Sequence, residues 1–384
     1  MQDVLADDDL PLQVHAVPMK VAVGAICPLD NPQSHIRLLR FDRSHEKEPS
    51  FAGNVRLETY DLFEAPPYAA ISYTWGSEIP RRSLRVDGKN VRILQSSWCA
   101  IKQAFGEGSF AHVWIDSVCI DQTSSEEKSF QVQLMSTIYR KAVHVLVSLG
   151  PISSRYSLTA RQIFRLENDP AWAAWDADAP PAWAGNEDQS ASQRRIKILE
   201  KWFHRDSGVR KLRKIREELR QIALLPYWTR VWIVQEISLA GVVRLMLGDY
   251  TIHWRSLSEF YNFISSRSPN GVPPQPLTLL YASKLPGRMI STEQSLPKVL
   301  QTFSTQQCSD PRGRVYGLLS LISWPKPYAY ITPDYNKPTL AVAAETLKYG
   351  AQADEVLKLM RCQDLERDLT HADRTTPVLP ILDT

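Results

Sequence analysis

One short segment combines two carboxylates and an amide at the end of an apolar run. In VWIDSVCIDQ (113–122), three apolar or aromatic positions lead into Asp116, and Asp121 and Gln122 follow a few positions later. Such a run is typical of a buried strand, and parallel α/β sheets bind ligands beyond the carboxyl ends of their strands. These side chains are therefore candidates for binding a polar ligand. The alternative is that Asp116 and Asp121 cap the next helix and accept bonds from loop amides.

A second apolar run, YAAISYTWGS (68–77), also ends in polar and aromatic residues. It is expected to begin as a strand and to break at Gly76. If this strand and the one before Asp116 are neighbours, their ends open onto one crevice. The ligand-binding candidates contributed by this segment are Ser72, Tyr73, Trp75 and Gly76.

The third candidate is Glu236, in a segment (225–241) that is predicted to be one helix with Pro226 near its start and Gly241 as its C-cap. Helical spacing places the Glu236 carboxylate on one face with four neighbours, Trp228, Trp232, Gln235 and Leu239. A carboxylate among indoles and a leucine needs a partner, or its pKa rises, and a perturbed carboxylate in a cleft is a candidate for catalysis. The alternative is a structural ion pair with Arg230.

These segments lie within an alternation of strands and helices that predicts an α/β fold with a parallel sheet flanked by helices. The predicted strands are 35–41, the start of 68–77, the hairpin 83–93 with an Asp87-Gly88 turn, 112–120, 143–150 and 242–248. The predicted helices are 96–105, 225–241, and two that begin at the S-x-x-E capping boxes Ser124–Glu127 and Ser256–Glu259.

Composition changes along the chain divide it into three parts. Residues 1–34 are an irregular lead-in, residues 35–265 form the main domain with an insertion at about 151–222, and residues 277–384 form a mainly helical C-terminal region. A Pro-rich stretch at 266–276 marks the boundary. Within the insertion, residues 194–220 hold eleven Lys/Arg against four acidic residues. This run favours a solvated helix face, so nucleic acid is not expected as a partner.

The overall composition excludes several classes of protein. The formal net charge of +3 gives no global attraction to nucleic acid or membranes. The five cysteines share no C-x-x-C spacing, and no HExxH, GxGxxG or P-loop motif occurs, so no metal site and no such phosphate cradle is predicted. Neither a signal peptide nor a membrane span is apparent, which predicts a cytoplasmic location.

Four blocks, in order, resemble the heterokaryon incompatibility (HET) domain family of filamentous fungi. They are YAAISYTWGS, VWIDSVCIDQ, EEKSFQVQLMSTIYRKAVHVLVSLG and YWTRVWIVQEISLA, and together they span about 68–241. The later CSDPRGRVYGLLSL resembles a block that commonly follows the domain, and the resemblance continues loosely to about 345. Gly313 departs from that block, which usually carries an acidic residue at this position, so a family salt bridge in the helical part is in doubt.

This resemblance implies a role in non-self recognition that triggers programmed cell death, akin to innate immune signalling. HET domains are similar to TIR domains, which have a flavodoxin-like fold, and some TIR domains cleave the nicotinamide–ribose bond of NAD with one glutamate. That glutamate lies in a W-x-x-E pattern. Here Trp232 precedes Glu236 by four positions, one more than in that pattern, so Glu236 is the implied catalytic residue and the register stays open.

The resemblance also implies how NAD would be held as a substrate. Trp75 or Trp232 would stack on a flat base, and Ser72, Asp116 and Gln122 would bond to the ribose hydroxyls. No cofactor or metal is required, because nicotinamide leaves as a neutral molecule. The alternative is a non-catalytic TIR-like adaptor that acts by self-assembly or nucleotide binding. Either reading implies a homo-oligomer and an upstream sensor or incompatibility partner protein.

Overall fold

The computed structural model describes residues 23–41, 54–76, 81–150, 156–173, 189–206, 209–267, 295–322, 324 and 330–349. Most of the lead-in predicted for 1–34 lies outside these residues, as does the predicted boundary at 266–276 from residue 268 onward. The mainly helical region predicted for 277–384 is described only in part.

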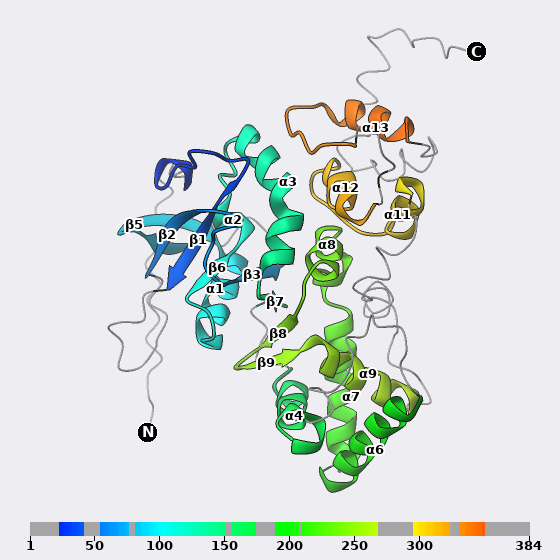
Figure 1. The fold of residues 1–384 in the computed structure, drawn as a ribbon. Coiled ribbons are helices and arrows are strands. Elements are labelled where there is room, and N and C mark those ends of the chain that lie inside the picture. The colour runs from blue at the N-terminus through cyan, green and yellow to red at the C-terminus, as the bar shows by residue number, and fades with distance from the viewer. Residues whose placement is uncertain are drawn as a thin grey trace, which may run out of the picture.

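The strands of the described residues form one nine-stranded mixed sheet in the order β5-β4-β2-β1-β6-β3-β7-β8-β9 (Figure 1). The strands are β1 (His35–Phe41), β2 (Asn54–Asp61), β3 (Tyr68–Tyr73), β4 (Arg81–Val86), β5 (Lys89–Leu94), β6 (His112–Trp114), β7 (His144–Ser148), β8 (Val243–Leu247) and β9 (Tyr250–His253). The α/β fold predicted from the alternation of elements is therefore confirmed.

Four parallel strands, β6-β3-β7-β8, form the centre of this sheet. Numbered by their appearance in the chain, their order is 2-1-3-4, which is that of the first four strands of a flavodoxin-like sheet. β9 follows antiparallel to β8, and β1 flanks the other side antiparallel to β6. The connections reverse direction at β3, and in doubly wound sheets such a switch point is where ligands bind.

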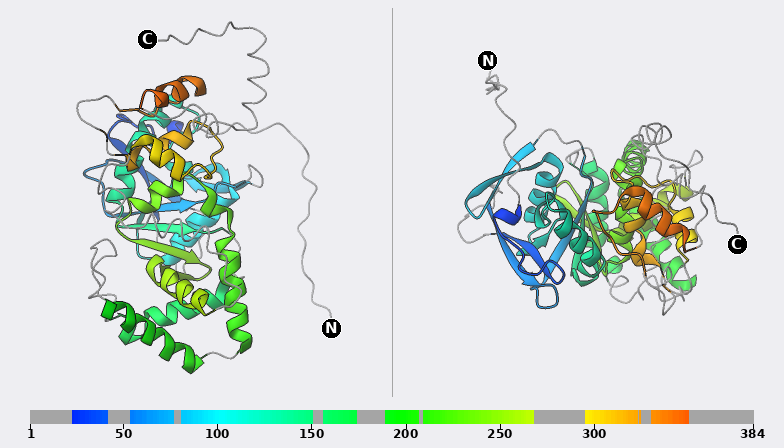
Figure 2. Two further views of the ribbon diagram at one scale, coloured as in Figure 1. Left: turned by 90° about the vertical axis from the view of Figure 1, so that its right-hand side faces the viewer. Right: turned by 90° about the horizontal axis from the view of Figure 1, so that it is seen from above.

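Helices cover both faces of the central strands and extend beyond the sheet at two ends (Figures 1 and 2). α4, α6, α7 and α9 gather beyond β9, whereas α11, α12 and α13 lie beside α8 and α3. The helical segments are η1 (Val23–Ala25), α1 (Gln95–Glu107), α2 (Asp116–Cys119), α3 (Ser125–Lys141), α4 (Ser157–Glu167), α6 (Gln189–Asp206), α7 (Val209–Ala223), η3 (Pro226–Thr229), α8 (Trp232–Ser238), α9 (Trp254–Ser266), α11 (Leu296–Thr302), α12 (Gly313–Tyr316), η4 (Leu319–Leu321) and α13 (Thr339–Leu347).

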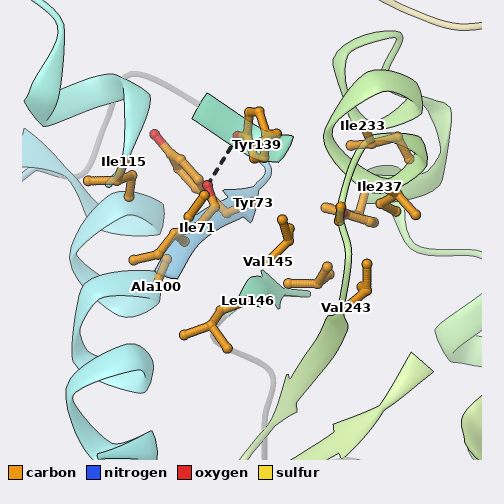
Figure 3. Packing of buried hydrophobic residues seen from close by; sticks show 14 of the residues in the cluster. Ile71, Tyr73, Ala100, Ile115, Tyr139, Val145, Leu146, Ile233, Ile237 and Val243 are labelled. Atoms are coloured by element: carbon orange, nitrogen blue, oxygen red, sulfur yellow. Dashed lines mark hydrogen bonds between the residues drawn. The ribbon is translucent and has the colours of Figure 1, made fainter. Parts of the chain in front are cut away.

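The central strands separate α1 from α8, and side-chain alternation along each strand serves both layers. In Figure 3, Leu146 of β7 lies on the side of Ala100 and α1, whereas Val145 lies on the side of Ile237 and α8. Both β7 residues are fully buried. Because successive strand residues point to opposite faces, a central strand with helices on both sides is apolar throughout. This explains why β3 and β7 have no alternating polar pattern.

One local prediction is confirmed in detail and a second is confirmed in part. Asp87 and Gly88 both have positive φ, 47° and 77°, as the tight hairpin turn between β4 and β5 requires. At the start of α3, the Ser124 hydroxyl accepts a bond from the Glu127 backbone N–H at 3.2 Å. The Glu127 carboxylate does not return the bond to Ser124. It forms a buried ion pair with Arg37 at 2.5 Å and accepts the Asp121 N–H at 2.7 Å.

Two predicted elements are wrong in extent. The strand expected at 112–120 ends at Trp114, because the next residues turn into α2, whose Cys119 N–H bonds to the Ile115 carbonyl at 2.8 Å. The helix expected at 225–241 breaks into η3 and α8, because residues 229–231 pair with Gln307 instead of continuing the helix. Gly241 consequently caps neither segment.

The capping box predicted at Ser256–Glu259 is also wrong. α9 begins at Trp254, and its N-cap, His253, makes no side-chain capping bond. Ser256 is instead buried in the first turn. The helix begins directly after β9, whose last residue, His253, donates its N–H to the Glu167 carboxylate of α4 at 2.7 Å.

Candidate functional site

The carboxyl ends of β3 and β6 lie side by side, since Tyr68–Ala70 pair in parallel with His112–Trp114. Alternation along β3 sends its last two side chains to opposite faces of the sheet. Ser72 meets residues of η3 and α8, whereas the Tyr73 hydroxyl bonds to Ser97 of α1 at 3.0 Å. Of these two neighbours, only Ser72 therefore faces the layer that contains Glu236.

Glu236 lies on α8 beneath the end of β3 and is 2% exposed. Its carboxylate accepts a short hydrogen bond from the Ser72 hydroxyl, and the same hydroxyl is 2.6 Å from the Tyr227 hydroxyl. Burial raises the pKa of Glu236 to about 7, although the nearby Arg230 charge and the Ser72 bond both oppose this increase. Glu236 is therefore a buried carboxylate that can change its charge near neutral pH.

Arg230 connects Glu236 to the strand ends, and sequence reasoning considered it only as a structural ion-pair partner. It lies in the break between η3 and α8, and its guanidinium donates a short hydrogen bond to the Tyr73 carbonyl at the end of β3. Burial alone would lower the pKa of Arg230, but the charges of Glu236 and Asp116 raise it above its ordinary value. Arg230 is thus a fixed positive charge between two carboxylates.

A pocket of about 480 Å³ lies at this edge of the sheet. Its volume is within the range of small-molecule sites. The lining residues come from the end of β3, from α2 and the loop after it, from α3, from the start of α8 and from the C-terminal part. They are Thr74, Trp75, Gly76, Asp116, Ile120, Gln122, Lys128, Val132, Met135, Arg230, Trp232, Gln307, Cys308, Ser309, Asp310 and Tyr335.

Asp116 is the predicted site carboxylate that lines this pocket, at the first position of α2. Its two oxygens accept bonds from the Trp75 indole N–H at 2.8 Å and from the Ser117 N–H at 2.7 Å. Gln122 folds back to donate to the Asp116 carbonyl at 3.0 Å. Burial raises the pKa of Asp116, and Arg230 opposes that effect. These contacts fix Asp116 beside an indole and a guanidinium.

The predicted site residues divide into two groups. Trp75, Gly76, Asp116, Gln122 and Trp232 line the pocket. Ser72, Tyr73, Asp121 and Glu236 do not line it and are buried.

Asp121 has local structural contacts instead of a place in the pocket. Its carboxylate accepts the Thr123 N–H at 2.9 Å, the Thr123 hydroxyl at 2.6 Å and the Gly24 N–H at 3.3 Å. These bonds hold the loop that leads into α3, as the structural alternative in the sequence analysis expected.

The C-terminal part forms one wall of the pocket, which the sequence analysis missed. Tyr335 is anchored to α3, because its N–H donates to the Ser129 hydroxyl at 2.8 Å. Gln307 pairs with Arg230 as an isolated parallel bridge. Gly313 packs so closely on α8 that an added Cβ would lie 3.2 Å from the Trp232 ring and 2.5 Å from the Cys308 sulfur. An acidic side chain at 313 would not fit this packing.

Three further features of the described residues concern their thiols, metal ligands and helices. The cysteines they contain, Cys27, Cys99, Cys119 and Cys308, are all free thiols. No group of three or more His, Cys, Asp or Glu side chains there is arranged to hold a metal ion. Within the same ranges, every helix is too short or too polar to cross a membrane.

The sequence of this chain is similar to one protein family and to two known proteins. Residues 68–236 match the family described as Heterokaryon incompatibility protein (HET). The chain is 23% identical to Heterokaryon incompatibility protein 6, OR allele, of Neurospora crassa over 384 residues, covering 88% of this chain and 54% of that protein. It is 33% identical to Vegetative incompatibility protein HET-E-1 of Podospora anserina over 129 residues, covering 32% of this chain and 9% of that protein.

The chain therefore spans about half the length of the first of these curated relatives and a small fraction of the second. No solved structure matches the chain significantly. The predicted site residues all fall inside the matched residues 68–236. They lie within the first two sequence blocks quoted above, except Trp232 and Glu236, which lie in the fourth. The wall formed by residues 307–310 and 335 falls outside them.

Proposed function

We propose that this chain, whose residues 68–236 match the heterokaryon incompatibility (HET) family, acts as a fungal incompatibility module. The support is that both relatives described above are named as incompatibility proteins. In this proposal the protein recognises a non-self signal through a partner protein and triggers cell death from the cytoplasm.

The proposed activity is cleavage of the nicotinamide–ribose bond of NAD in the pocket beyond β3 and β6. One observation carries this proposal: the Asp116 carboxylate lines a pocket that also contains two indoles, Trp75 and Trp232. The bond between ribose C1′ and the nicotinamide nitrogen breaks, and its electron pair leaves with neutral nicotinamide. Water then adds to C1′ and releases a proton. A fixed carboxylate stabilises the positive charge that builds on the ribose more than it stabilises the uncharged sugar.

Within this proposal, Asp116 and Glu236 have different roles. Asp116 is the carboxylate that would touch the ribose, because it lines the pocket. Glu236 is 2% exposed and acts from behind, where its charge holds Arg230 and its bond holds Ser72. The TIR resemblance implies that Glu236 contacts the substrate. In this proposal Asp116 contacts the ribose instead.

Nicotinamide release from NAD tests the proposal directly. Purified protein, concentrated to promote assembly, is incubated with NAD, and free nicotinamide is measured by chromatography. Asp116→Asn is expected to lower the rate by roughly a hundredfold or more, as loss of an electrostatic stabiliser of the transition state does. Asp249→Asn, in the exposed turn after β8, is the matched control and should keep the parent rate. No release by the parent protein, or equal rates for both variants, would contradict cleavage by Asp116.

A second candidate function is a non-catalytic adaptor, which the burial of Glu236 favours. A carboxylate that is 2% exposed and bonded to Ser72, which also meets Tyr227, fits a structural role as well as a chemical one. Cell death on expression in hyphae distinguishes the two. If Asp116→Asn still kills cells while releasing no nicotinamide, the adaptor is correct. If killing and nicotinamide release are lost together while the variant stays folded, the enzyme is correct.

A further inference from the structure

Lys128 is a half-buried cation in the wall of the pocket. It lies in the first turn of α3, and its ammonium sits 4.1 Å from the centre of the Tyr335 ring. Within the described part of the chain, no carboxylate lies within the 4.0 Å of an ion pair with this ammonium. Lys128 is also at the helix end where the backbone dipole is positive, which is unfavourable for a cation. An anion bound beside it would remove both disadvantages.

The other pocket charges already have partners among the described residues. Asp310 receives two bonds from the Arg312 side chain, at 2.7 and 3.0 Å. Arg230 interacts electrostatically with Asp116 as well as with Glu236. Asp310 is therefore paired with Arg312, and Asp116 shares Arg230 with Glu236, so neither carboxylate of the pocket wall forms an ion pair with Lys128.

The environment of Lys128 supports the same conclusion. Burial lowers the pKa of its ammonium, and the nearby Asp310 only partly offsets this effect. A charge held in such a place without a counterion costs free energy, which a bound anion returns. The Tyr335 ring beneath it fixes the ammonium in place, since a cation over an aromatic face is attracted to the ring.

We propose that Lys128 binds a phosphate group of a nucleotide whose base packs on the indoles of the same pocket. This inference rests on the pocket being the ligand site of the proposed function, but it does not require that the ligand is cleaved. The indoles are Trp75 and Trp232, on the walls formed by β3 and α8. A phosphate suits this position because its negative charge would serve as the counterion of the Lys128 ammonium. Ammonium groups bind phosphates as point charges.

Binding of ADP and adenosine to the full chain, measured by calorimetry, tests the role of the phosphate. Lys128→Met removes the charge but keeps an unbranched side chain over Tyr335, and Lys128→Arg restores the charge. The matched control is Lys141→Met, because Lys141 lies on the same helix with its ammonium 4.8 Å from the centre of the Phe63 ring, and it does not line the pocket. Thermal unfolding of every variant shows whether the fold is retained.

The expected result is that Lys128→Met binds ADP roughly tenfold to a hundredfold more weakly, as loss of a charged hydrogen bond does. Its affinity for adenosine should change less than about twofold on the same basis, since the base contacts remain. Lys128→Arg should recover much of the ADP affinity, and added salt should weaken ADP binding to the parent more than to Lys128→Met.

Three results would overturn the inference. They are equal ADP affinities of Lys128→Met and Lys141→Met, equal losses for ADP and adenosine, and a parent protein that binds no ADP. Each can be told apart from failure of the proposed function, which is decided by nicotinamide release. If the protein binds ADP through Lys128 but leaves NAD intact, the phosphate site is supported and the proposed NAD cleavage is refuted. If Lys128→Met has unchanged ADP affinity and still cleaves NAD, the phosphate site is refuted and the proposed NAD cleavage is supported.

Discussion

Replacing Glu236 with glutamine is expected to remove a pH dependence from the stability of the fold. The pKa of Glu236 is about 7 in the folded protein, whereas its ordinary value is 4.5. The folded protein therefore holds a proton on Glu236 between about pH 4.5 and 7 that the unfolded chain has released. Because the folded state binds more protons in this range, stability is greatest below it, falls as the pH rises through it, and is constant above it.

The size of the effect follows from the same pKa difference. Each pKa difference of one corresponds to about 1.4 kcal/mol, so ionisation of buried Glu236 lowers the free energy of unfolding by about 3 kcal/mol by pH 8. Glutamine has nearly the same shape and can still accept the Ser72 bond, but it does not ionise. The difference in stability between parent and Glu236→Gln should therefore change by about 3 kcal/mol between pH 4.5 and 8, in favour of the variant.

Urea unfolding followed by circular dichroism at several pH values measures this difference. The matched control is Gln235→Met, which alters the neighbouring buried residue and its 3.0 Å bond to Ser320 without removing an ionisable group. Its stability curve should stay parallel to that of the parent. If the Glu236→Gln curve is also parallel, Glu236 is ionised throughout this range, and the argument that burial outweighs Arg230 is wrong.

Three further substitutions and one matched control test how the site is supported, each by urea unfolding. Arg37→Met leaves the Glu127 carboxylate buried without its ion pair and should destabilise the fold by about 3–5 kcal/mol; a loss below about 1 kcal/mol would mean that the pair contributes little. Gly313→Ala forces a Cβ against the Cys308 sulfur and Trp232 and should cost about 1–3 kcal/mol. Gly106→Ala has open space and should be neutral or stabilising, so equal losses for the two would refute the packing argument. Ser124→Ala removes the N-cap of α3 and should cost about 1 kcal/mol, with no change refuting the cap.

Much of the fold could be predicted from short patterns in the sequence. The apolar runs of β3 and β7, the Asp87-Gly88 turn and the Ser124 cap each depend on neighbouring residues, so local reasoning was sufficient. It was not sufficient where distant residues intervene. The helix expected at 225–241 breaks because Gln307, more than seventy positions away, pairs with the backbone around Arg230.

By itself, the sequence determined the alternation of strands and helices at the centre of the sheet and the set of polar residues at the carboxyl ends of β3 and β6. It also identified Glu236 as a carboxylate in apolar surroundings. It did not predict β2 or β9. Only the tertiary structure decided that Asp116 lines the pocket while Glu236 lies behind it, and that Lys128 and Tyr335 complete the wall. The physical reason is that exposure and electrostatic partners depend on what packs against a side chain. Here those neighbours come from the C-terminal part and from helices far along the chain.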